Sequence, residues 1–212
     1  MNYRKSFFIF FLSIIILFSL YIYSLAKSYS NYVFNGISDS FIRFHVIANS
    51  NSTEDQILKY EIRDAIMSYI SPLLANVQNK EDALQIIDKN IPQMYNISSK
   101  ILSLKNMNYS IKISLGKSKF PTKDYSEFIL PEGIYDALKI EIGKANGQNW
   151  WCVMFPSICI PQQDIVNLNQ KTTSILENSL NSEELSIISK DTSTTDIKIK
   201  FKIIEIFENL WI

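Results

Sequence analysis

The chain is poor in the residues that build several common kinds of site. Its 212 residues include one histidine and two cysteines, so a zinc site with four Cys and His ligands is excluded. Five glycines and six prolines are too few for a collagenous, Gly-linker or Pro-rich disordered chain. No Gly-x-Ser-x-Gly elbow, His-Glu-x-x-His motif or acidic calcium loop occurs, although a carboxylate-only magnesium or calcium site stays open. We therefore expect no metal and no other cofactor.

Charge is balanced, with 21 Lys and Arg residues against 21 Asp and Glu residues. A chain without net charge lacks the long-range positive field that collects phosphate backbones, so nucleic acid is not an expected partner. Hydrophobic residues make up 47% of the sequence, which indicates that most of it folds. The length allows one domain with an appendage, or two small domains.

A long uncharged apolar segment lies near the N-terminus. Arg4 and Lys5 precede residues 6–26, which are rich in Phe, Ile and Leu. A basic start followed by about 20 apolar residues is typical of an export signal or membrane anchor, whereas a core helix of this length normally shows a polar face. The positive charge holds the N-terminus in the cytoplasm and directs the rest of the chain across the membrane. Residues 1–27 are therefore a signal peptide, cleaved after Ala26, or an anchor, and both alternatives stay open.

After a linker over residues 28–40, residues 41–48 alternate in the manner of a strand. One side of this strand is wholly apolar, and the other carries Arg43 and His45. A polar break follows, and the hydroxyl and acidic residues that come next predict a helix that starts near Thr53.

Later patterns predict two shorter helices and three strands, over 80–89, 92–105, 109–115, 134–142 and 148–155. Gly116 closes the first of these strands, and the turn over 143–147 joins the other two as a hairpin. The fold class is therefore α+β: an export or transmembrane helix, then one compact mixed domain over residues 41–161, with an antiparallel or mixed sheet packed by helices. A polar variable segment over 162–196 and a C-terminal strand over 197–212, expected to join the same sheet, complete the organisation.

His45 is the only imidazole of the chain, so any Ser/His/Asp or Cys/His mechanism would have to use it. Three interpretations stay open for Arg43 and His45: structural pairing with a carboxylate of the following helix, recognition of a partner, or acid–base catalysis by His45. The carboxylates available for pairing are Asp55, Glu61 and Asp64.

Cys152 and Cys159 lie seven residues apart, and on an unbroken strand they would face opposite ways. A reversal at Pro156 would bring the sulfurs together, and a disulfide persists in an exported protein, so we favour a bridge over two free thiols. Trp150 and Trp151 also face opposite ways on a strand. One of them would fill the core while the other meets solvent or a partner, unless loops bury both.

Several motifs occur in one order between residues 41 and 159, and together they resemble the stage II sporulation protein R family of endospore-forming bacteria. The motifs are the runs Arg43–Ser50, Glu54–Gln56, Lys59–Ala65, Leu115–Gly116, Phe120–Tyr125, Leu130–Leu138 and Asn149–Cys159. The resemblance implies a signal protein that is made in the forespore and exported into the space between the two membranes of the sporulating cell. It further implies that the signal activates a membrane-embedded aspartic protease, which then cleaves the precursor of the mother-cell sigma factor sigma-E.

No catalytic residue is expected in such a signal, which would act by binding the extracytoplasmic part of the protease. The candidates for partner binding are Arg43, His45, Asn49, Asp55, Arg63, Trp150 and Trp151. The alternative is an exported hydrolase that acts on cell-wall material or peptides through His45 or a pair of carboxylates. The sequence leaves open the oligomeric state and whether activation is direct.

Overall fold

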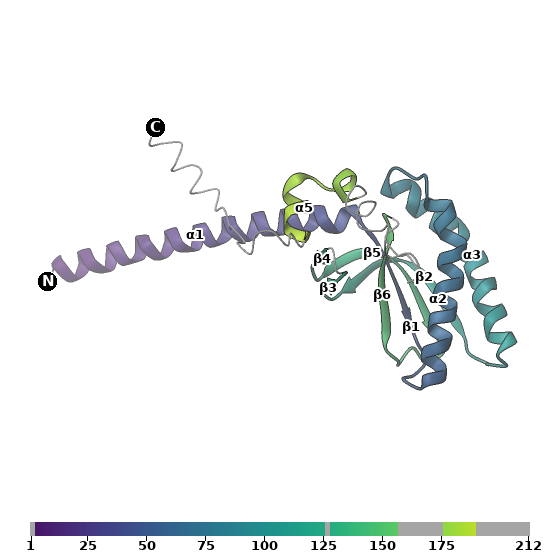
Figure 1. Cartoon of the computed structure of the whole chain (residues 1–212). Coiled ribbons are helices and arrows are strands. Elements are labelled where there is room, and N and C mark those ends of the chain that lie inside the picture. Colours follow the sequence, from purple (N-terminus) through teal and green to yellow (C-terminus); the bar gives the residue numbers. More distant parts are fainter. Residues whose placement is uncertain (1–2, 126–127, 157–175, 190–212) are drawn as a thin grey trace.

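The computed structural model describes residues 3–125, 128–156 and 176–189 (Figure 1). A long apolar helix at the N-terminus leads into a domain in which helices pack against a mixed sheet, which confirms the expected α+β class. The expected C-terminal strand, Cys159 and much of the polar segment lie outside the described residues.

Helix α1 spans Tyr3–Ser40 and projects away from the domain in Figure 1. It is the one helix within the described residues that is long and apolar enough to cross a membrane. Residues 28–40, expected as a linker, continue this helix because Val33 and Ile37 recur at helical spacing and are buried in the domain. Gly36 lies against the Glu184 side chain of α5 (Ser182–Ile188), where any larger residue would collide with the carboxylate.

The main sheet has four strands in the order β2-β5-β1-β6. Their bounds are Ile42–Ile47 for β1, Ile111–Phe120 for β2, Gly133–Ile142 for β5 and Asn149–Phe155 for β6. Strand β1 runs parallel to β5 and antiparallel to β6, and β2 runs antiparallel to β5. The short strands β3 (Lys123–Asp124) and β4 (Ile129–Leu130) form a separate antiparallel pair.

Two expectations about the strands are wrong. Strands β5 and β6 do not form a hairpin, because β1 lies between them and pairs with both. Strand β2 also continues through Gly116 to Phe120, since the pairing with β5 keeps one register over the whole length.

Helix α2 spans Thr53–Leu74, and the side chain of Ser52 caps it by accepting a hydrogen bond from the backbone N–H of Asp55, as the pattern predicts. Helix α3 spans Lys80–Leu104 as one continuous helix, so the expected division before Pro92 is wrong. Buried residues on both sides of the proline, Ile87 and Met94 among them, anchor the two halves to the same core. Tertiary packing thus outweighs the hydrogen bond that proline removes.

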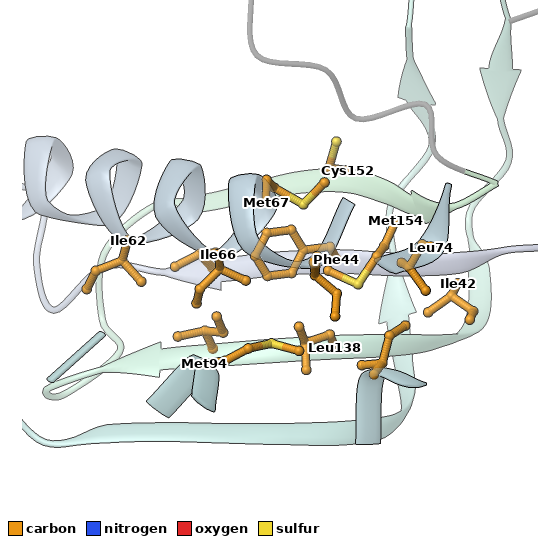
Figure 2. Close-up of a cluster of buried hydrophobic side chains, with 14 of the residues drawn as sticks. Ile42, Phe44, Ile62, Ile66, Met67, Leu74, Met94, Leu138, Cys152 and Met154 are labelled. Atoms are coloured by element: carbon orange, nitrogen blue, oxygen red, sulfur yellow. The ribbon is translucent and has the colours of Figure 1, made fainter. Parts of the chain in front are cut away.

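The helices α2 and α3 cover one face of the sheet (Figure 1). Phe44 of β1 lies at the centre of this core among Ile66, Met67 and Leu138, as Figure 2 shows. The opposite face carries a second, smaller core. Its buried residues come from α1, the strands and the segment around α5: Val33, Ile37, Phe41, Phe120, Phe128, Leu130, Tyr135, Ala137, Val153, Leu176, Leu180 and Ile188.

Candidate functional site

Arg43 lies on the face of the sheet opposite α2, with no solvent exposure. Its Nε donates a hydrogen bond to the carbonyl oxygen of Cys152 at 3.1 Å, and its Nη2 donates to the hydroxyl oxygen of Tyr125 at 2.7 Å. The guanidinium carbon also lies 4.4 Å from the centroid of the Phe120 ring and 4.9 Å from that of Tyr135. Burial lowers the pKa of Arg43, while the two tyrosines oppose that effect.

The expected pairing of Arg43 with a carboxylate of the following helix is therefore wrong. Alternation along β1 turns Arg43 away from α2, and the three carboxylates have other partners. Asp55 accepts hydrogen bonds from Asn49 and Ser50, Asp64 pairs with Arg63, and Glu61 pairs with Lys105. Buried Arg43 is thus held by aromatic rings, a hydroxyl and a carbonyl.

The side chains of Phe120, Tyr125 and Tyr135 surround Arg43 and form what we call the Arg43 pocket. The imidazole of His45 lies beside this pocket and stacks on Trp151, with ring centroids 4.9 Å apart and planes within 3° of parallel. Phe120 contacts the imidazole edge to face. Neither ring nitrogen of His45 has a hydrogen-bond partner among the described residues. Burial, together with the positive charges of Lys139 and Arg43, lowers the pKa of His45 to about 4, against the opposing effect of Glu141. The ring is therefore neutral at pH 7, and the described residues place no acid–base partner on it.

Asn49 and Asp55 build a polar clamp between two loops. The Asn49 side chain donates to Asp55 at 2.8 Å and accepts a bond from the backbone N–H of Lys144 at 3.0 Å. Burial on its own would raise the pKa of Asp55, but hydrogen bonds from Ser50 and Asn49 hold it below the ordinary value. Since Asp55 is 3% exposed and already bonded, this pair positions the loop that leads into α2.

Arg63 and Trp150 form a surface cluster with Tyr60, which we call the Trp150 cluster. The Arg63 guanidinium carbon lies 4.3 Å from the Trp150 ring centroid and 4.8 Å from that of Tyr60. The same guanidinium forms an ion pair with Asp64 at 2.6 Å. Trp150 is half-buried, and its Nε1 donor has no partner among the described residues, while Tyr60 is exposed.

A buried lysine lies beside this cluster. Lys59 is 1% exposed and donates to the side chain of Gln56 and to the carbonyl oxygen of Gln148. Burial, reinforced by the charge of Arg63, lowers its pKa. An arginine held against two aromatic rings is the kind of group that anchors protein interfaces.

The two tryptophans do face opposite sides of the sheet, with Trp150 packed on the larger core and Trp151 on the smaller one. Cys152 carries no free thiol. Because Cys159 lies outside the described residues, the bridge between the two cysteines stays a prediction. Among the described residues no group of three or more His, Cys, Asp or Glu side chains is placed to hold a metal ion.

Pattern reasoning from the residues did not find the aromatic partners of Arg43. Tyr125 and Tyr135 lie 82 and 92 positions away along the chain, and no periodicity connects them with β1. Both tyrosines do fall inside runs that carry the family resemblance, which was the one available signal.

A family model described as Stage II sporulation protein R (spore_II_R) matches residues 38–165, from the last turn of α1 through every strand of the main sheet. The chain belongs to this family. It is also 30% identical, over 186 residues, to the protein named Stage II sporulation protein R of Bacillus subtilis (strain 168). That alignment covers 82% of this chain and 83% of the relative. No solved structure matches the chain.

Membership in the stage II sporulation protein R family confirms the resemblance seen in the sequence. The family is one of sporulation signalling proteins. The matched region contains the Arg43 pocket, the clamp at Asn49 and the Trp150 cluster. The apolar part of α1 precedes it and is compatible with a signal peptide or a membrane anchor.

Proposed function

We propose that this protein is an exported signal of the forespore, which activates a membrane-embedded aspartic protease and so triggers processing of the sigma-E precursor. Membership in the family supports the signalling role. The protein would act outside the cytoplasm by binding, in the space between the two membranes of the sporulating cell.

The observation that carries this proposal is the continuity of α1 with the signalling domain. The uncharged stretch ends near Ala26, and Val33, seven residues later, is already buried in the domain. At 1.5 Å per helical residue, about 10 Å of helix separates the two positions. If α1 remains uncleaved, the domain is therefore held close to the membrane surface, where the extracytoplasmic part of a membrane-embedded protease would lie.

The Trp150 cluster is the surface that we propose for contact with the protease. Of the seven candidate residues, Arg43, His45 and Asp55 are buried. Arg63 and Trp150 remain accessible together, and Arg63 is held by stacking, so little side-chain freedom is lost on binding. Arg43, His45 and Trp151 would then stabilise β6 from the opposite face of the sheet.

Binding alone is sufficient for activation if the signal prefers the active state of the protease. Moving an equilibrium from 1:99 to 99:1 requires about 5.5 kcal/mol of differential affinity. A few desolvated aromatic and arginine anchors at an interface supply energies of this order.

The test is reconstitution: the protease and the sigma-E precursor are coexpressed with and without this protein, and precursor cleavage is followed on immunoblots. Cleavage is expected only when the protein is present and exported. A version without residues 1–27 controls for export and should be inactive. Cleavage that is equally efficient without the protein would overturn the proposal.

The same assay addresses catalysis by the protein itself. The variants His45→Ala, Asp55→Ala and Asp64→Ala remove the imidazole and two carboxylates near it in sequence. If activation needs only binding, the exported and folded variants retain precursor cleavage. Loss of cleavage in His45→Ala, with stability unchanged, would revive the hydrolase alternative.

A further inference from the structure

Strand β2 forms one edge of the main sheet over ten residues, without a register shift. Within the described residues, no strand pairs with its outer side. A straight edge strand of this length presents a row of backbone donors and acceptors that another chain can extend.

The register of β2 shows which of its residues offer those groups. The N–H of Gly143 donates to the carbonyl oxygen of Ser110 at 2.8 Å, so these opposed residues form a hydrogen-bonded pair. Bonded and non-bonded pairs alternate along an antiparallel ladder. Even-numbered residues of β2 therefore bond to β5, and the odd-numbered ones direct their N–H and C=O groups outward. The outward residues are Ile111, Ile113, Leu115, Lys117 and Lys119.

Gly116 lies in the middle of this edge, and no packing contact of the fold explains it. A Cβ atom added at Gly116 would meet no heavy atom within 4 Å, and the residue has no positive φ. Glycine weakens a strand interior and often marks a place where another backbone approaches closely. Because the Cβ atom of a strand residue points out of the plane of the sheet, the open space at Gly116 lies over the face of the sheet and not beside its edge.

The charge of the edge is positive. Strand β2 contains Lys112, Lys117 and Lys119 and no acidic residue. Asp136 and Glu141 on β5 are each shared between two lysines, since Lys80 and Lys117 contact the first, and Lys112 and Lys139 contact the second. Lys119 takes part in none of the ion pairs found among the described residues.

We propose that β2 provides a second contact with the partner protein, at the opposite edge of the sheet from β6 and its Trp150 cluster. There β2 binds an extended acidic segment of the partner, which adds to the main sheet as a further strand. The inference rests on the proposed function for the source of that segment. Backbone bonds to the odd-numbered residues would supply the affinity, and carboxylates opposite the lysines would set the preference. A second copy of β2 fits less well, because it would bring three lysines against three without any acidic residue. Residues 197–203 of this chain, which belong to the strand expected to join the same sheet, also carry three lysines and no acidic residue, so they fit no better.

The first experiment uses the full-length protein in detergent and a fluorescent eight-residue peptide of alternating Glu and Val as the probe. Anisotropy measures its affinity beside a Lys and Val peptide of the same length. We expect the acidic peptide to bind at least about tenfold more tightly, with a preference that weakens as salt is raised. A third peptide, N-methylated at alternate residues, loses one row of backbone donors and should bind at least about tenfold more weakly than the acidic peptide.

Two variants locate the peptide on β2. Lys117→Pro removes an outward N–H without removing a bond to β5, and its matched control Lys117→Ala loses the same ion pairs but keeps the N–H. The proline variant should lose binding, while the alanine variant loses about threefold at most. Lys119→Glu should weaken the acidic peptide by about threefold to tenfold and improve the lysine peptide.

Equal affinity for the acidic and lysine peptides, or no effect of N-methylation, overturns the proposal even if Lys117→Pro fails to fold. Dimers that form through this edge, detected by sedimentation and abolished by Lys117→Pro, would identify a second copy as the occupant and also overturn the proposal.

The reconstitution assay distinguishes a failure of this proposal from a failure of the proposed function. Wild-type protein that triggers precursor cleavage, with Lys117→Pro folded and fully active, refutes the edge as the partner contact but keeps the proposed function. If the acidic peptide binds but no precursor is cleaved, the binding site on β2 is supported and the proposed function is refuted.

Discussion

The Nη2 atom of Arg43 donates a hydrogen bond to the Tyr125 hydroxyl from a position that has no solvent exposure. The two residues come from the first strand of the sheet and from the segment next to β3, so this bond ties distant parts of the domain together. Aromatic faces and two oxygen acceptors accommodate the buried charge, where a carboxylate is the more usual partner.

Arg43→Ala should destabilise the full-length protein by about 3 to 5 kcal/mol, because it leaves a cavity and removes the hydrogen bonds that Arg43 donates to the Cys152 carbonyl and the Tyr125 hydroxyl. Arg43→Lys should recover only part of this loss, since an ammonium cannot reproduce the planar fork of donors. Chemical denaturation in detergent measures both, with the exposed Lys119→Ala as the control that changes stability by less than about 0.5 kcal/mol. A cost below about 1 kcal/mol for Arg43→Ala would contradict a structural role for the guanidinium.

His45 should make stability fall as the pH is lowered from about 6.5 to about 4. In the folded protein the pKa of His45 is lowered to about 4, whereas the unfolded chain takes up the proton near 6.5. The unfolded state therefore binds more protons throughout this window, and the loss approaches about 3 kcal/mol at its lower end.

The comparison variant is His45→Phe, which keeps a ring on Trp151 and removes the titrating group. Its free energy of unfolding should be flatter over the same pH range. The acidic groups Asp55, Asp136 and Glu141 also lose their contribution as the pH falls through their lowered pKa values, but they do so in both proteins. Parallel pH profiles would show that His45 is solvated in the folded state.

Local patterns predict the elements of this fold well where one physical cause dominates. Alternation gives β1, because every second residue there is apolar and buried, and the hydroxyl of Ser52 gives the start of α2. The division at Pro92 fails because the buried residues of α3 on either side of it pack on one core. The predicted hairpin is wrong for a similar reason. The turn residues indicate that the chain reverses direction between β5 and β6, but they do not show that β1 lies between these strands.

For the candidate site, too, the sequence predicts some features correctly and misses others. Sequence reasoning selects Arg63 and Trp150 as interface residues, and the structure stacks them on each other. It also selects Arg43 as a surface contact, although that residue is fully buried. Amphipathic alternation shows which residues share a face, but it does not show whether that face is covered. Here α1, the segment around α5 and the aromatic residues beside Arg43 cover it, and only tertiary structure brings them there.

Arg63→Glu tests the Trp150 cluster as the contact with the protease. The substitution reverses one charge on a partly exposed side chain, so stability should change by less than about 1 kcal/mol. In the reconstitution assay we expect precursor cleavage to fall at least about tenfold, as for truncation of an interface anchor. Lys100→Glu, on the exposed side of α3, is the matched control and should remain active. Full activity of Arg63→Glu would exclude this cluster as a contact.

The last prediction concerns Cys152, which lies on the larger core beside Met67 and Met154 (Figure 2). We expect the exported protein, denatured without reductant, to yield no titratable thiol, because Cys159 is the one other cysteine of the chain. A bridge across so short a loop stabilises by about 2 to 3 kcal/mol, so dithiothreitol should lower the free energy of unfolding by that amount. The double variant Cys152→Ala/Cys159→Ala should not respond to the reductant. Two reactive thiols in the untreated protein would show that no bridge forms, and the core position of Cys152 would then be occupied by a buried free thiol.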